Sequence, residues 1–68
     1  MKRLEAIEFV GEADGIIELM DSGFVWIEGE SIGMPNSPNV KKKAKELIKK
    51  FNITKEDLLK LKIIEKLK

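Results

Sequence analysis

The nine residues FNITKEDLL (51–59) constrain the fold most, because they contain the signals that end one helix and begin another. Asn52 is a residue type that can end the first of these helices. Thr54, followed three positions later by Asp57, resembles a capping box in which Asp replaces the usual Glu or Gln. We therefore predict two helices joined by a tight connection.

The first of these helices is expected to begin where Ser37 precedes Pro38, because Ser is a preferred N-cap and Pro is favoured at the first helical position. We predict this helix over residues 38–51 and the second over 54–67. The alternation in LLKLKII also fits a strand at 59–64, and the cap before it favours the helix.

The first half of the chain has short runs of branched and apolar residues, separated by turns rich in Gly and Asp. Such runs are typical of strands, and short connections favour antiparallel neighbours. We predict strands at residues 4–10, 15–20 and 23–28, followed by a loop at 29–37. The predicted fold is α+β: a single small domain (1–68) with a three-stranded antiparallel β-meander (1–28) followed by two C-terminal helices packed on one face.

The chain has 68 residues and contains neither Cys nor His. Disulfides are therefore excluded, and the preferred ligands of zinc are missing. A core this small is marginal alone, which favours unusually good helix packing or a partner subunit. No apolar segment has the length of a signal peptide or membrane span, so we expect a cytoplasmic protein. Abundant Lys, Glu and Ile suggest either heat adaptation or an AT-rich genome.

Few of the residue patterns that carry chemistry occur in the chain. A nucleophilic triad lacks its His or Cys, and the glycines match no phosphate-binding motif. Carboxylates at Glu12, Asp14, Glu28 and Glu30 would gather at one end of the predicted meander, but their spacing matches no calcium loop. We therefore predict no enzyme activity, no catalytic residue, no cofactor, no metal and no small-molecule substrate.

Charge is distributed unevenly along the chain. Residues 1–40 contain eight acidic and two basic side chains, whereas residues 41–68 contain eleven lysines and four acidic side chains. On helix 38–51 the apolar residues form one stripe of about 100°, and the lysines fill the remaining circumference. Lysines alone would bind phosphate without reading sequence. The candidates for nucleic-acid contact are Lys41, Lys42, Lys45 and Lys49, and the alternative is a solvated helix face.

The predicted helix 54–67 is apolar over most of its circumference, which is typical of a helix buried on two sides. One side of this helix is expected to pack on the rest of the domain. The other side is expected either to contact another chain or to be buried within the same core. Both faces of the strand 23–28 are also apolar, so its aromatics are either core residues or interface anchors. The candidate interface residues are Phe24, Trp26, Leu61, Ile64 and Leu67.

These observations lead to two hypotheses about function. The first is a small protein-interaction module that self-associates, for example as a dimer, or docks on a partner protein through the C-terminal helix and the outer sheet face. The second is sequence-independent nucleic-acid binding through helix 38–51.

Overall fold

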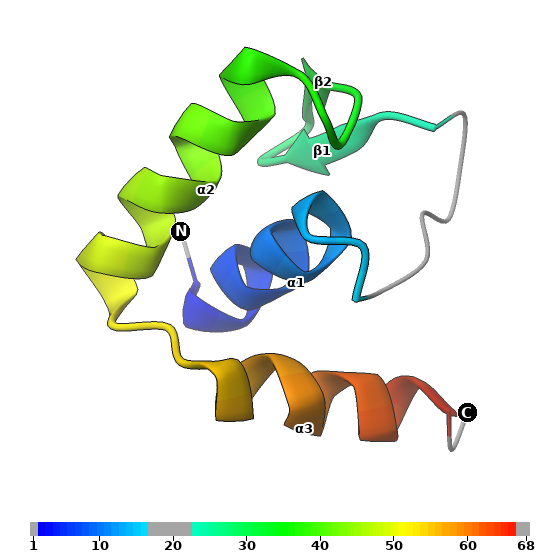
Figure 1. Ribbon diagram of the computed structural model, residues 1–68, viewed down its shortest axis with the longest axis vertical. Coiled ribbons are helices and arrows are strands. Elements are labelled where there is room, and N and C mark those ends of the chain that lie inside the picture. The colour runs from blue at the N-terminus through cyan, green and yellow to red at the C-terminus, as the bar shows by residue number, and fades with distance from the viewer. Residues whose placement is uncertain (1, 17–22, 67–68) are drawn as a thin grey trace.

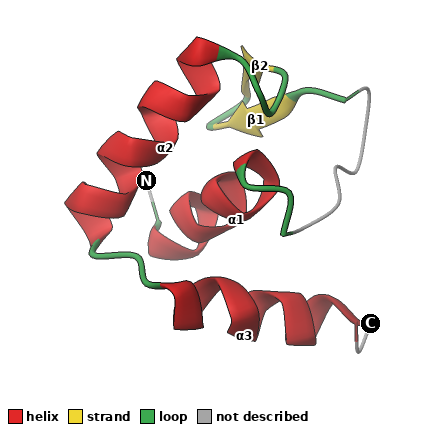
Figure 2. Ribbon diagram, in the orientation of Figure 1, coloured by secondary structure: helices red, strands yellow, loops and turns green. Residues whose placement is uncertain are grey.

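The computed structural model describes residues 2–16 and 23–66, with the side chains described up to Ile63. Figures 1 and 2 show the elements in the order helix, hairpin, helix, helix. The two predicted C-terminal helices are confirmed, and residues 59–64 are helical rather than extended. The elements are α1 (Arg3–Ala13), β1 (Val25–Ile27), β2 (Glu30–Gly33), α2 (Pro38–Phe51) and α3 (Lys55–Lys66).

The prediction of a three-stranded meander is wrong. Residues 4–10, predicted as a strand, belong to helix α1. Most of the second predicted strand, 15–20, lies outside the described residues. The third, 23–28, contains the shorter strand β1, and the predicted loop 29–37 contains strand β2. The described sheet is therefore a two-stranded antiparallel hairpin.

Helix α1 forms because most of its apolar residues recur at helical spacing and are buried together, whereas Leu4 is 55% exposed. Glu5, Glu8 and Glu12 are three and four positions apart and form the opposite, polar side. Glu5 also lies in the first turn, where a negative charge stabilises the helix dipole. The buried side consists of Ala6, Ile7, Phe9, Val10 and Gly11.

The hairpin is closed by a two-residue turn. Glu28 and Gly29 both have positive φ, 50° and 79°, as a type I′ turn requires. This turn matches the right-handed twist of the strands that it joins, and β1 pairs with β2 in antiparallel register. Val25 and Ile27 face the core, and Trp26 between them faces outward.

Local hydrogen bonds define the ends of α2 and α3 as the sequence predicted. Ser37 Oγ accepts a bond from the Val40 N–H at 3.3 Å, and Asn52 ends α2 in the left-handed conformation. Thr54 and Asp57 form a reciprocal capping box. The Asp57 N–H donates to Thr54 Oγ1 at 3.3 Å, and the Thr54 N–H donates to Asp57 Oδ2 at 2.8 Å.

Helix α1 is the centre of the fold. It packs against α2, α3 and β1, while α2 also contacts β2. Figure 1 shows α1 between the hairpin and α3. The prediction that the two C-terminal helices pack on one face of a sheet is therefore wrong, because strands of three and four residues offer too little surface. Ile32 of β2 is only partly buried against the core, which is formed by residues of α1, β1, α2, α3 and the α2–α3 connection: Ala6, Ile7, Phe9, Val10, Val25, Ile27, Val40, Ala44, Leu47, Ile53, Leu58 and Leu61.

Candidate functional site

Large apolar side chains are exposed on the outer side of the hairpin. Trp26 is 49% exposed and Phe24, just before β1, is 42% exposed. Both were predicted as interface candidates, and both lie outside the core. Alternation along the strand explains this, because the neighbouring Val25 and Ile27 already fill the inner face.

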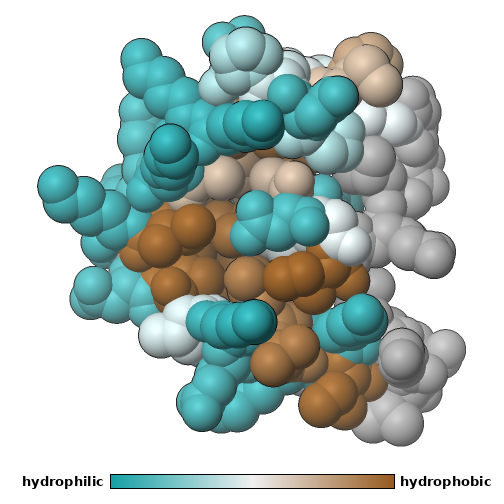
Figure 3. Space-filling view, in the orientation of Figure 1, coloured by the Kyte–Doolittle hydropathy of each residue, from teal (hydrophilic) through white to brown (hydrophobic). Residues whose placement is uncertain are grey.

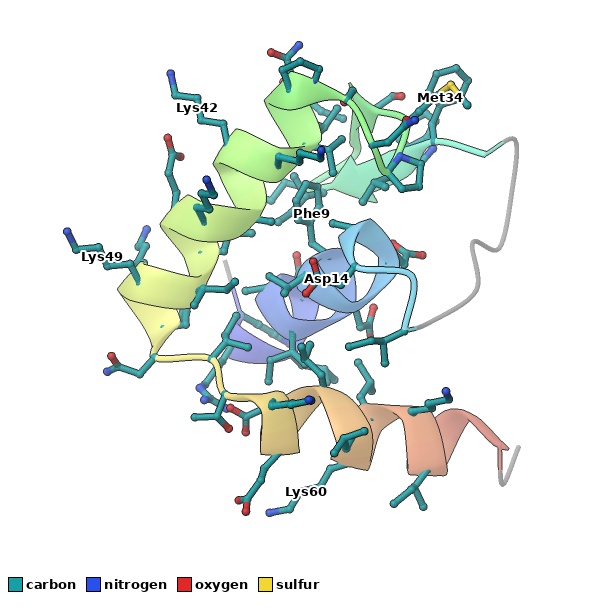
Figure 4. All side chains as sticks on the ribbon, viewed as in Figure 1. Phe9, Asp14, Met34, Lys42, Lys49 and Lys60 are labelled. Carbon is teal, nitrogen blue, oxygen red and sulfur yellow. The ribbon has the colours of Figure 1, made fainter. Side chains whose placement is uncertain are left out.

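Met34 belongs to the same surface, and sequence reasoning missed it because it lay in a predicted loop. It follows β2 and is 55% exposed. The register pairs Val25 with Gly33, so their chain neighbours Phe24 and Met34 lie together at the open end of the hairpin. Figure 4 shows Met34 at this end, pointing away from the body of the molecule. We call Phe24, Trp26 and Met34 the hairpin patch.

An acidic depression of about 130 Å³ lies between α1 and the hairpin turn, beside the hairpin patch. The polar side of α1 supplies three glutamates, and the turn supplies a fourth. Trp26 forms part of the wall, so an indole ring and several carboxylates face the same space. The lining residues are Glu5, Glu8, Glu12, Trp26, Ile27, Glu28 and Gly29.

The carboxylates predicted to gather at one end of a meander are divided between two sites. Glu12 and Glu28 line the acidic depression, whereas Asp14 lies on another surface of the molecule. The reason is that α1 is a helix, in which residues two positions apart point to different sides. Within the described ranges 2–16 and 23–66, no group of three or more potential metal-ligating side chains is close enough to hold an ion.

The four predicted nucleic-acid candidates, Lys41, Lys42, Lys45 and Lys49, are all exposed on α2. Figure 4 shows Lys42 and Lys49 extending away from the body of the molecule. The opposite side of α2 is buried through Val40, Ala44 and Leu47. The lysines therefore surround the buried stripe, as the helical projection predicted.

Two of these lysines border an apolar groove of about 340 Å³ between α2 and the end of α1. Ile48, which is partly exposed, contributes to its apolar surface. Figure 3 shows hydrophobic side chains gathered on this face, between α2 and α3, and Figure 4 shows Asp14 on the same face, at the end of α1. We call this surface the basic groove; its lining residues are Ala13, Asp14, Lys41, Ala44, Lys45 and Ile48.

The interface candidates on the last helix have different outcomes. Leu61 is only 6% exposed and belongs to the core, so its prediction as an interface residue is wrong. The side chain of Ile64 and the whole of Leu67 lie outside the described part of the structure. Among the described side chains of α3, the exposed large apolar ones are instead Leu59 and Ile63. The packing of α3 against α1 determines which leucines of α3 are buried. The sequence of the helix alone did not specify which of its sides faces α1.

No protein-family model, no curated protein and no solved structure matches the chain. Among the described residues, no helix is long and apolar enough to cross a membrane. The chemistry of the described surfaces is therefore the basis for a functional assignment. These surfaces are an aromatic patch beside an acidic depression, and a lysine-bordered apolar groove.

Proposed function

We propose that this chain is a non-catalytic protein-interaction module that binds through the outer face of its hairpin. The observation that carries the proposal is the hairpin patch, in which Phe24, Trp26 and Met34 are between 42% and 55% exposed. Aromatic and Met side chains are enriched in protein interfaces, and Trp is the residue most often found to dominate binding energy.

The composition of the patch supports a binding role over a folding role. The chain has only one Trp and three Phe, and two of these four side chains are placed on the surface. Their exposure leaves apolar area in water, which is unfavourable until a partner covers it. The non-catalytic part of the proposal rests on the sequence, which lacks the usual general bases and nucleophiles His and Cys.

Helix α3 provides a second, separate surface for the proposed binding through Leu59 and Ile63, since α1 lies between α3 and the hairpin. Leu61, which is buried, has no part in it. Burial of Leu58 and Leu61 against α1 accounts for one side of the helix, so the exposed pair is available to a partner.

Site-directed photo-crosslinking tests this proposal. A photoreactive aromatic residue is placed at Phe24, at Met34 or, as a matched control, at Glu46, which is exposed on α2 and lies outside the proposed surface. In cells that produce the chain, we expect a product of defined mass from positions 24 and 34 and none from position 46. Excess unlabelled wild-type chain should compete the product away, whereas excess Trp26→Ser should not. Equal products from all three positions, or none from 24 and 34, would contradict the proposal.

Nucleic-acid binding through α2 is the second candidate, supported by the exposure of Lys41, Lys42, Lys45 and Lys49 on one helix. Such binding would be independent of sequence and would weaken log-linearly as salt rises, because it depends on counterion release. Anisotropy titrations with labelled duplex and single-stranded oligonucleotides at low and physiological salt test it. Absence of binding at low salt rules this candidate out.

A further inference from the structure

We propose that the acidic depression of one copy binds the basic groove of a second copy, with Trp26 seated in the groove. The chain would then self-associate head to tail. This inference rests on the proposed function and names its partner as the chain itself.

Charge complementarity is the first argument. Glu5, Glu8 and Glu28 line the acidic depression together with Trp26, and Lys41 and Lys45 border the basic groove. Opposite charges around an interface steer association and select the partner and its orientation. The uneven charge of the sequence, acidic before residue 40 and basic after it, is the origin of both surfaces.

Apolar complementarity is the second argument. The basic groove has a volume of about 340 Å³, and the small side chains of Ala13 and Ala44 leave room for a large ring against Ile48. Trp26 is the large exposed ring in the acidic depression. Covering it removes apolar area from water on both copies. Lysine at the edge of the groove can also interact with the face of the indole ring.

Asp14 decides between a second copy and a nucleic acid as the occupant of the groove. Asp14 is part of the lining of the basic groove, where its carboxylate would repel a phosphate backbone. An indole N–H needs an acceptor when it becomes buried, and a carboxylate provides one. The groove therefore suits a tryptophan side chain better than it suits phosphate. The glutamates around the depression would then lie at the edge of the groove, near Lys41 and Lys45.

The two surfaces lie on opposite sides of α1, which determines the symmetry of the contact. At about 100° per residue, Glu5, Glu8 and Glu12 fall within about 60° of one another, and Asp14 follows Glu12 by about 200°. A contact between two different surfaces is heterologous, so it leaves one free depression and one free groove on each pair. Such contacts continue into a ring or an open chain of copies.

Charge reversal on each surface, measured by sedimentation velocity over a concentration series at low salt, tests the inference. The variants are Glu5→Lys with Glu8→Lys, and Lys41→Glu with Lys45→Glu. The matched control is Lys55→Glu with Lys60→Glu, which makes the same charge change as the groove variant at exposed positions on α3. Circular dichroism checks that each variant is folded.

We expect the wild type and the α3 control to sediment faster as concentration rises. Each surface variant should raise the dissociation constant by about tenfold or more, because like charges then face each other. An equimolar mixture of the two surface variants should restore association, because the reversed depression of one then faces the reversed groove of the other. Added salt should weaken all of these contacts.

Three results would overturn the inference: a wild type that stays monomeric throughout, surface variants that associate like the wild type, or a mixture that restores nothing. A monomeric wild type that still crosslinks to another protein from positions 24 and 34 would overturn this inference and leave the proposed function standing. Oligonucleotide binding that depends on Lys41 and Lys45, without self-association, would assign the groove to nucleic acid instead.

Discussion

Arg3, the chain's single arginine, connects three helices through one side chain. Its guanidinium donates to the carbonyl oxygens of Phe51 and Asn52 at 3.2 and 3.3 Å, at the end of α2. It also donates to both carboxylate oxygens of Asp57, at 2.9 and 3.4 Å, in the first turn of α3. A positive charge at a helix C-terminus is favourable, and the fork of guanidinium donors suits a carboxylate.

Asp57 is held ionised by this arrangement. The hydrogen bond from Arg3 and then the Thr54 backbone N–H lower the pKa of Asp57 from 3.8 to about 2. The folded pKa is therefore below the unfolded one, so the unfolded chain binds the proton more readily. The contribution of Asp57 to stability is present above the unfolded pKa and is lost as the pH falls towards the folded value.

We expect Asp57→Asn to lower the urea midpoint of unfolding at neutral pH. The difference from wild type should close as the pH falls from about 5 to about 2, because the wild-type carboxylate then becomes protonated. Urea unfolding followed by circular dichroism at several pH values measures it. Glu46→Gln, which removes an exposed carboxylate on α2, is the control and should run parallel to wild type. A pH-independent gap for Asp57→Asn would contradict the prediction.

At the level of elements, local signals predicted the α2–α3 connection correctly, but α1 was predicted as a strand. The capping bonds at Ser37, Thr54 and Asp57 each join residues three positions apart, so the sequence around them is sufficient. Helix α1 has no side-chain cap at Lys2, and its Ile, Phe and Val residues also favour strands. The available signal was the spacing of Glu5, Glu8 and Glu12, which fits a helix.

Leu61 and Leu59 test which side of α3 packs on the core. Leu61 is buried and Leu59 is 47% exposed on the same helix. We expect Leu61→Ala to cost about 2–5 kcal/mol of unfolding free energy, because it leaves a cavity in the core. Leu59→Ala should change it by no more than about 0.5 kcal/mol. Urea unfolding of both variants measures the difference. Equal losses would show that α3 packs on α1 through another face.

At the scale of the whole molecule, the core is organised around α1 rather than around a sheet. Phe9 and Val10 are fully buried in the middle of this helix, and they meet residues from β1, α2 and α3 in one cluster. The hairpin contributes Val25 and Ile27 to this cluster and keeps its other face for solvent. The same arrangement exposes the aromatics of the hairpin patch.

The losses of stability caused by substituting Phe9 and Phe24 test whether the core is centred on α1. Phe9→Ala should cost about 3–5 kcal/mol, which is most of the stability of a domain this small. Phe24→Ala should cost no more than about 0.5 kcal/mol, since Phe24 is 42% exposed. Thermal unfolding at low protein concentration, where self-association contributes little, compares them. A larger loss for Phe24 than for Phe9 would contradict the α1-centred core.

The sequence by itself determined the features that depend on neighbours within one helical turn or one strand. These are the caps at Ser37 and Thr54, the end of α2 at Asn52 and the lysine-covered side of α2. Each results from hydrogen bonds or periodicity among adjacent residues. Phe24, Trp26 and the lysines of α2 could therefore be found as candidates without a structure, whereas Met34 could not.

Only the tertiary structure decided the features that depend on residues distant in the chain. Burial of one whole side of the segment 3–13 against α2, α3 and β1 makes it a helix, and packing on α1 places Leu61 inside and Leu59 outside. Arg3 reaches Asp57 across 54 positions. Separation of the acidic depression from the basic groove likewise follows from the helical turn of α1. The free energy gained by burying a side chain depends on which residues cover it. Those residues are distant in the chain, so the local sequence does not specify them.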